Sequence, residues 1–166
     1  MKRLFMALAI TTVTATTAYA ADPKLEGTFS DWSVYSRADG RELICYAIAK
    51  PEAKAPSNVN HGDIYFMVAN WKSGAAKEQP SLLTGYSLKT TRAPLAYVGS
   101  TKVTMYASEN EAFVDANADE RTLVRKMRAG SKMRVEAVSS RGTETSYIFS
   151  LKGITAALRK AKTTCS

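Results

Sequence analysis

The sequence predicts an all-β protein, a sandwich or a barrel, with one short internal helix and a C-terminal helix. From Phe29 onward, apolar and polar residues alternate with a period of two in short runs. Gly, Pro, Asn and Asp residues separate the runs, as the turns between strands require. Eight such runs in a chain of 166 residues fit either architecture.

The first twenty residues have the features of a secretory signal peptide. Lys2 and Arg3 precede the apolar run 4–10, and Ala18-Tyr19-Ala20 provides small residues for cleavage after Ala20. Cleavage would remove two of 23 cations and none of the 15 acids, so the formal charge would fall from +8 to +6. We expect residues 21–166 to form a single exported domain with no nucleic-acid partner. No later run reaches the roughly 18 apolar residues of a membrane span, so no transmembrane segment is expected there.

The clearest pair of predicted strands is a hairpin late in the chain. Ser140-Arg141-Gly142 is a three-residue connection whose glycine suits the left-handed position of such a turn. Val135 and Ala137 are expected to face Tyr147 and Phe149 across this hairpin. The eight predicted strands are Phe29–Ser36, Glu42–Ala49, Asp63–Trp71, Leu82–Lys89, Thr101–Ala107, Glu111–Asp115, Met133–Ser139 and Thr143–Leu151.

Two segments have a helical rather than a strand pattern. Asp119 is expected to cap a helix over Glu120–Ala129, which Gly130 ends. The second helix is predicted over 154–163, and extending its apolar stripe reaches Cys165, which should therefore face the body of the domain. The residues of that stripe, at i, i+3, i+4 and i+7, are Ile154, Ala157, Leu158 and Ala161.

Cys45 and Cys165 are the two cysteines of the chain. An even pair in an exported protein favours a disulfide, whereas two free thiols would require that the chain stays in a reducing compartment. The disulfide would close a long loop, for which the chain-entropy estimate is roughly 4 to 5 kcal/mol. Around Cys45, we expect the bulky face of the strand in the core and the small face against the C-terminal helix. The bulky face carries Ile44, Tyr46 and Ile48, and the small face carries Cys45, Ala47 and Ala49.

The sequence has few residues that indicate catalysis. His61 is the single histidine, and it lies in the polar segment 50–62, where it is expected to be exposed and to bind no metal. Neither a glycine-rich phosphate loop nor a Gly-x-Ser-x-Gly turn is present, and no cofactor is expected. We therefore expect a non-enzymatic protein. A periplasmic hydrolase that uses His61 or scattered carboxylates remains the alternative.

Positive charge is concentrated late in the chain. Residues 121–134 contain six cations and no acid, and the C-terminal helix adds more. Such a surface suits an anionic partner, for example lipopolysaccharide phosphates, acidic lipid head groups or sulfated host glycans. The other interpretation is a solvated basic face that only keeps the domain soluble. The candidate binding residues are Arg121, Arg125, Lys126, Arg128, Lys132 and Arg134.

An ordered set of short motifs resembles the invasion-associated locus B family of exported bacterial proteins. No motif is specific alone, but together they span nearly all of the chain after residue 20. The matching pieces are Phe29-Ser30-Asp31-Trp32-Ser33-Val34-Tyr35, Cys45-Tyr46-Ala47, Lys50-Pro51, Gly85-Tyr86, Leu123-Val124, Met127, Gly130, Ser140-Arg141-Gly142-Thr143, Tyr147, Ser150-Leu151-Lys152-Gly153 and Cys165.

The resemblance implies an immunoglobulin-like β-sandwich located in the periplasm or cell envelope, or secreted. It implies no catalytic residues, because the family has no established reaction. It also implies a link to bacterial entry into host cells, for which the family is named. One position departs from the pattern, since Ser36 stands where many members have a cysteine.

Overall fold

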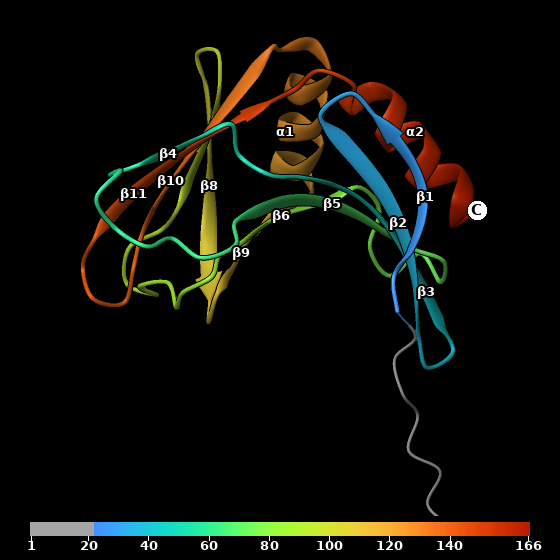
Figure 1. The fold of residues 1–166 in the computed structure, drawn as a ribbon. Helices are drawn as coiled ribbons and strands as arrows, with labels where there is room; N and C mark the ends of the chain where they lie inside the picture. Colours follow the sequence, from blue (N-terminus) through green and yellow to red (C-terminus); the bar gives the residue numbers. More distant parts are fainter. Residues whose placement is uncertain (1–21) are drawn as a thin grey trace, which may run out of the picture.

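The computed structural model describes residues 22–166, so the expected signal peptide lies outside the described residues. Eleven strands and two helices follow one another along the chain (Figure 1). They are β1 (Lys24–Phe29), β2 (Trp32–Asp39), β3 (Glu42–Ala49), β4 (Ala53–Ala55), β5 (Tyr65–Trp71), β6 (Gln79–Leu83), β7 (Leu95–Val98), β8 (Thr101–Ser108), β9 (Glu111–Val114), α1 (Asn117–Ala129), β10 (Lys132–Val138), β11 (Glu144–Ser150) and α2 (Ile154–Thr164).

All strand pairs are antiparallel, and they join in the order β1-β2-β3-β5-β6-β9-β8-β7-β10-β11-β4. The sheet bends back on itself, so that β5 and β11 face each other across the core. The ring centroids of Phe66 on β5 and Phe149 on β11 are 5.6 Å apart. In Figure 1 the β10 and β11 end lies to the left and the β2 and β3 end to the right. The predicted all-β, sandwich-like fold with a C-terminal helix is confirmed.

The predicted hairpin is confirmed as β10 and β11. Val135 lies opposite Tyr147 as expected, but Met133, not Ala137, lies opposite Phe149. Ala137 pairs with Thr145 and is buried on the same face. Gly142 has the expected positive φ, 91°. The alternation in this part of the sequence is regular because one face of the hairpin is packed on the core.

The prediction of Leu82–Lys89 as a strand is wrong, because the strand, β6, comes earlier. Proline lacks an N–H group and usually marks an edge or a strand start, so the sequence gives no reason to place Pro80 inside a strand. In the fold, Pro80 pairs with Val68 on β5, but the pairing of β6 with β9 begins only at Ser81. Pro80 therefore has a strand neighbour on one side only. The short strands β1, β4 and β7 were not predicted.

Both helices are present near their predicted positions. Helix α2 begins at Ile154 as expected and buries the predicted apolar stripe. The prediction that Asp119 caps the internal helix is wrong: α1 begins three residues earlier than expected, Ala116 occupies the N-cap position, and no side chain caps it. Asp119 lies in the first turn, where its negative charge complements the helix dipole. Gly130 ends the helix as expected.

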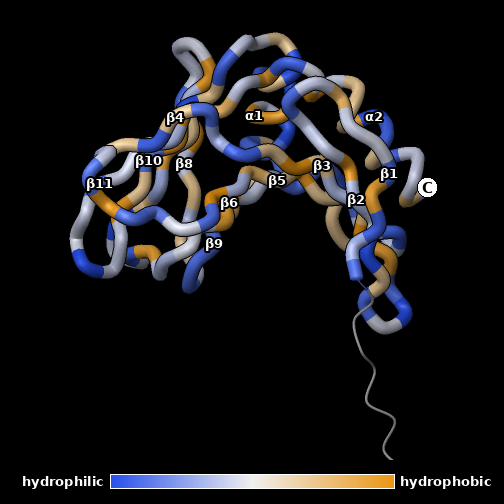
Figure 2. Tube along the Cα trace, viewed as in Figure 1, coloured by the Kyte–Doolittle hydropathy of each residue, from blue (hydrophilic) through white to orange (hydrophobic). Residues whose placement is uncertain are grey.

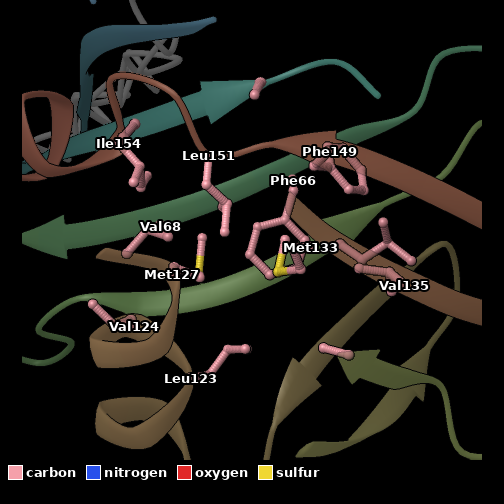
Figure 3. Packing of buried hydrophobic residues seen from close by; sticks show 14 of the residues in the cluster. Phe66, Val68, Leu123, Val124, Met127, Met133, Val135, Phe149, Leu151 and Ile154 are labelled. Carbon is pink, nitrogen blue, oxygen red and sulfur yellow. The ribbon is translucent and has the colours of Figure 1, made fainter. Parts of the chain in front are cut away.

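Helix α1 closes one end of the core. Leu123, Val124 and Met127 are fully or almost fully buried and point toward Val68 of β5 and Met133 of β10 (Figure 3). Their spacing in the sequence places them on one face of the helix. The opposite, exposed side of α1 carries most of the predicted basic residues, so the packing of the helix determines which charges reach solvent.

Helix α2 packs against β1, β2 and β3, and the disulfide between Cys45 and Cys165 fixes it there. The small face of β3 is buried beneath the helix as expected, since Ala47 is fully buried. The expectation that the bulky face fills the core is wrong. Ile44, Tyr46 and Ile48 are only partly buried, on the side of the sheet away from α2. Small residues allow the helix to approach the strand closely, and this requirement decides which face is covered.

The turn between β1 and β2 contacts the junction between β11 and α2. Trp32 Nε1 donates a hydrogen bond to the Ser150 carbonyl oxygen (2.9 Å), and Ser150 Oγ donates to the Asp31 carboxylate (2.6 Å). Gly153 has φ +92°, and a Cβ there would lie 1.9 Å from the Phe29 carbonyl oxygen, so only glycine fits. The first motif of the resemblance is therefore in direct contact with the motif Ser150-Leu151-Lys152-Gly153.

Candidate binding surface

His61 is a buried structural residue. The sequence predicted an exposed histidine, but its exposed fraction is only 7%. Its Nε2 donates to the Pro56 carbonyl oxygen and its Nδ1 lies 2.9 Å from the Tyr147 hydroxyl, so both ring nitrogens have partners. A loop position was expected to expose the His61 ring to solvent, but the segment 56–61 folds back over β11. Packing against Tyr147 therefore buries the ring.

The hydrogen bonds of His61 continue through three hydroxyl groups. Tyr147 Oη lies 2.7 Å from Tyr86 Oη, which lies 2.8 Å from Thr145 Oγ1, and Thr145 donates to the Ala137 carbonyl. Burial raises the pKa of Tyr147, and the hydrogen bond with Tyr86 raises it further by a smaller amount, so the hydroxyl keeps its proton. The ring nitrogens of His61 contact neither a serine nor a carboxylate. This cluster therefore satisfies buried polar groups and does not have the geometry of a hydrolase triad.

The six candidate basic residues lie on two neighbouring elements. Arg121, Arg125, Lys126 and Arg128 are exposed on α1, and Lys132 and Arg134 follow on β10. Arg121, Arg125 and Arg128 are spaced i, i+4 and i+7, which places them along one stripe of the helix. Lys126 is offset from that stripe. The structure thus gathers four of the six on one helix, as the sequence indicated.

Three of the six cations have acidic partners, and two of these partners lie far away in the sequence. Arg128 forms an ion pair with Glu78 of the β5–β6 connection, and Lys132 forms one with Glu52 before β4. Arg134 pairs with Glu136, and its guanidinium lies 4.2 Å from the centroid of the Tyr97 ring. Each carboxylate lowers the positive charge that these residues present to a partner. These three residues therefore contribute less to an anion-binding surface than their sequence suggested.

The other three cations are without an acidic partner in residues 22–166. Arg121, Arg125 and Lys126 make no ion pair there, and all three are exposed. They lie on the outward side of a helix whose inner side is anchored in the core by Leu123 and Met127. We call these three residues the α1 cation cluster. Its charge is available to an anion at low desolvation cost.

Metal binding and membrane insertion find no support among the residues that the structure describes. Within 22–166, no three His, Cys, Asp or Glu side chains come close enough to hold a metal ion. In the same range, neither helix has the length and apolar character that a membrane crossing needs.

The fold and these surfaces define an all-β protein closed by a disulfide and two helices. Residues 32–162 match the family description "Invasion associated locus B (IalB) protein", so the chain belongs to the invasion-associated locus B family. The match covers most of the chain, which confirms the resemblance seen in the short motifs. No curated protein and no solved structure shows a significant match to the chain.

Proposed function

We propose that this chain is an exported binding protein of the bacterial envelope, and that it acts by contact rather than by catalysis. Its partner is an anionic envelope or host-surface component, and the α1 cation cluster makes the contact. The observation that carries the proposal is the exposure of Arg121, Arg125 and Lys126 without acidic partners in the described chain.

Three features support export. The family is one of exported bacterial proteins, the cysteines form a disulfide, and the first twenty residues match a signal peptide in sequence. Structural disulfides persist mainly in oxidising compartments such as the periplasm. The family description also links its members to invasion, which makes a sulfated host glycan a second source of the same anionic chemistry.

The proposal is tested by neutralising the α1 cation cluster in a triple variant, Arg121→Gln, Arg125→Gln and Lys126→Gln. A Lys or Arg near an anionic bilayer contributes about 1 kcal/mol, so the triple variant should bind phosphatidylglycerol vesicles roughly 100-fold more weakly. Retention on immobilised heparin should fall in parallel and should depend on salt concentration. Vesicles and heparin separate the envelope source from the host-glycan source.

The matched control removes three exposed cations elsewhere. Lys89→Gln, Lys102→Gln and Arg141→Gln change the net charge by the same amount, and none of these residues makes an ion pair in residues 22–166. The control should retain most of the binding. Equal losses in both triple variants would show that total charge, and not the α1 cation cluster, governs retention, and the proposal would then be rejected.

A further inference from the structure

The face of the sheet opposite α2 carries a row of tyrosines on three adjacent strands. Tyr35 of β2 pairs across the strands with Tyr46 of β3, and Tyr65 lies further along the same face of β5, beyond Met67, which pairs with Ile48. All three side chains are partly buried and lie on the same side of the sheet as Ile48. Figure 2 shows apolar residues, in orange, along β3, β5 and β6 in this part of the fold. Neither helix covers this face.

A cleft of about 720 Å³ lies on this face, and Tyr35, Tyr46, Ile48 and Tyr65 line it. The rings of Tyr35 and Tyr46 are stacked, with centroids 6.0 Å apart and planes inclined by 22°. The volume falls within the range of small-ligand sites, roughly 300 to 1,000 Å³. We call this feature the tyrosine cleft, and these four residues form its apolar wall.

Polar groups line the other end of the tyrosine cleft. Asp31, Ser33, Lys50, Glu52 and Ser150 contribute side chains there. Lys50 Nζ lies 5.3 Å above the Tyr65 ring and 3.7 Å from Asp63, so its charge is already shared. Lys132 pairs with Glu52, so three carboxylates, of Asp31, Glu52 and Asp63, against two ammonium groups leave this end with an excess of one negative charge. Burial also raises the pKa of Tyr46, which keeps its hydroxyl protonated as a donor.

This combination of groups selects among ligand classes. A lipid chain or an apolar peptide would cover the hydroxyl and carboxylate groups without giving them hydrogen-bond partners, which is costly. An anionic ligand would be repelled by Asp31, which forms no ion pair within residues 22–166. A sugar ring instead offers an apolar C–H face to the negative faces of the tyrosine rings, and hydroxyl groups to the polar end. Its hydroxyls both donate to carboxylates and accept from tyrosines.

We propose that the tyrosine cleft binds a neutral oligosaccharide, with a pyranose face on the stacked rings of Tyr35 and Tyr46. Hydroxyl groups of the sugar then hydrogen-bond to Asp31 and Glu52 at the polar end. This site is separate from the α1 cation cluster and does not depend on the anionic partner proposed for it. The two sites have opposite charge and take chemically different ligands.

The experiment maps binding on the unmodified protein, expressed for export so that the expected leader is removed. Amide chemical shifts are followed by NMR while cellotriose or tri-N-acetylchitotriose is added to about 10 mM, a range that detects even millimolar dissociation constants. We expect shifts in β2, β3 and β5 near Tyr35, Tyr46 and Tyr65, and unchanged resonances on α1. Heparin serves as the anionic comparison.

Variants then test the stacking contribution. Tyr35→Ala and Tyr46→Ala should each weaken binding roughly three- to tenfold, because each removes one aromatic face. Tyr46→Phe keeps the ring and should retain more affinity than Tyr46→Ala. Tyr106→Ala is the matched control, since Tyr106 is 47% exposed on β8 and does not line the cleft. Thermal unfolding of each variant shows whether it remains folded.

Several results would overturn the proposal. Absence of shifts with both sugars would do so, and so would shifts confined to α1 or a larger effect of heparin than of the sugars at the cleft. A loss of affinity in Tyr106→Ala equal to that in Tyr35→Ala would also reject it. None of these results bears on vesicle binding by the α1 cation cluster. The two proposals can therefore fail independently.

Discussion

The two faces of strands β2, β3 and β5 share one backbone but have opposite surroundings. One face carries Val34, Ala47 and Val68, all fully buried against the helices and the opposing layer. The other carries Tyr35, Tyr46 and Ile48, which are larger but only partly buried. We call them the covered face and the open face. Size and apolar character do not decide burial here; the close approach of α2 does.

The open face therefore has a composition that stability alone does not explain. Large aromatic side chains gain most free energy when they are fully buried, yet here they line a solvent-filled cleft. Exposed apolar surface of this kind on a folded protein usually indicates an interaction site. The covered face contributes to stability and the open face is available for binding, and the following predictions test that division.

The largest expected effect comes from releasing the helix on the covered face. The double variant Cys45→Ser and Cys165→Ser should lower the free energy of unfolding by about 4 kcal/mol, because the disulfide closes a loop of 120 residues in the unfolded chain. Urea unfolding of the oxidised protein and the variant measures the difference. An unchanged midpoint would show that packing of α2 alone holds the covered face.

A smaller effect is expected from overfilling the covered face. Ala47→Leu should cost about 2 kcal/mol, because Ala47 is fully buried and has no space for a larger side chain. The matched change on the open face, Ala69→Leu, adds the same volume at a partly buried position that pairs with Tyr46, and it should cost less than about 1 kcal/mol. Equal losses in urea unfolding would contradict the difference between the two faces.

The smallest effect is expected from the polar edge of the covered face, at Glu26. Ser36 donates a hydrogen bond to Glu26 (2.8 Å), and with Lys24 it lowers the pKa of this carboxyl group. Lys160 of α2 also pairs with it at 3.9 Å. A lowered folded pKa means that the ionised carboxylate stabilises the protein at neutral pH. That contribution disappears as the pH falls from the ordinary value, about 4.3, through the lower folded value.

Glu26→Gln should therefore be less stable than the unmodified protein at pH 7, and the difference should vanish near pH 3 in thermal unfolding. Glu111→Gln is the control of opposite sign. Burial raises the pKa of Glu111, so its ionised form opposes folding, and the unmodified protein should gain stability over this variant as the pH falls. Parallel pH profiles for the two variants would show that the shifts do not arise from these contacts.

Much of the fold was predictable because it depends on local patterns. Alternation identified the β10–β11 hairpin, and the apolar stripe identified α2 and placed Cys165 on its inner side. Strands β4 and β7 escaped prediction because three or four residues are too few to show a period. Strand β1 escaped because a bulge between Leu25 and Gly27 interrupts its alternation.

The candidate site was only partly predictable. The sequence indicated the basic residues of α1 as a group because they lie on consecutive turns of one helix. The partner of Arg128, Glu78, is 50 positions away, and the partner of Lys132 on β10, Glu52, is 80 positions away, so no local pattern indicates these pairs. Tyr46 was expected in the core together with the rest of its bulky face. Only the position of α2 shows that Tyr35 and Tyr46 lie on the other face.

The sequence by itself determined the class of the fold, the two helices, the disulfide partners and the family. These follow from short-range periodicity, from the number of cysteines and from the order of short motifs. Only the tertiary structure decided which face of β3 is covered, that His61 is buried, and which cations remain unpaired. The physical reason is that burial and charge pairing depend on contacts between segments distant along the chain, which the residues of any single segment do not specify.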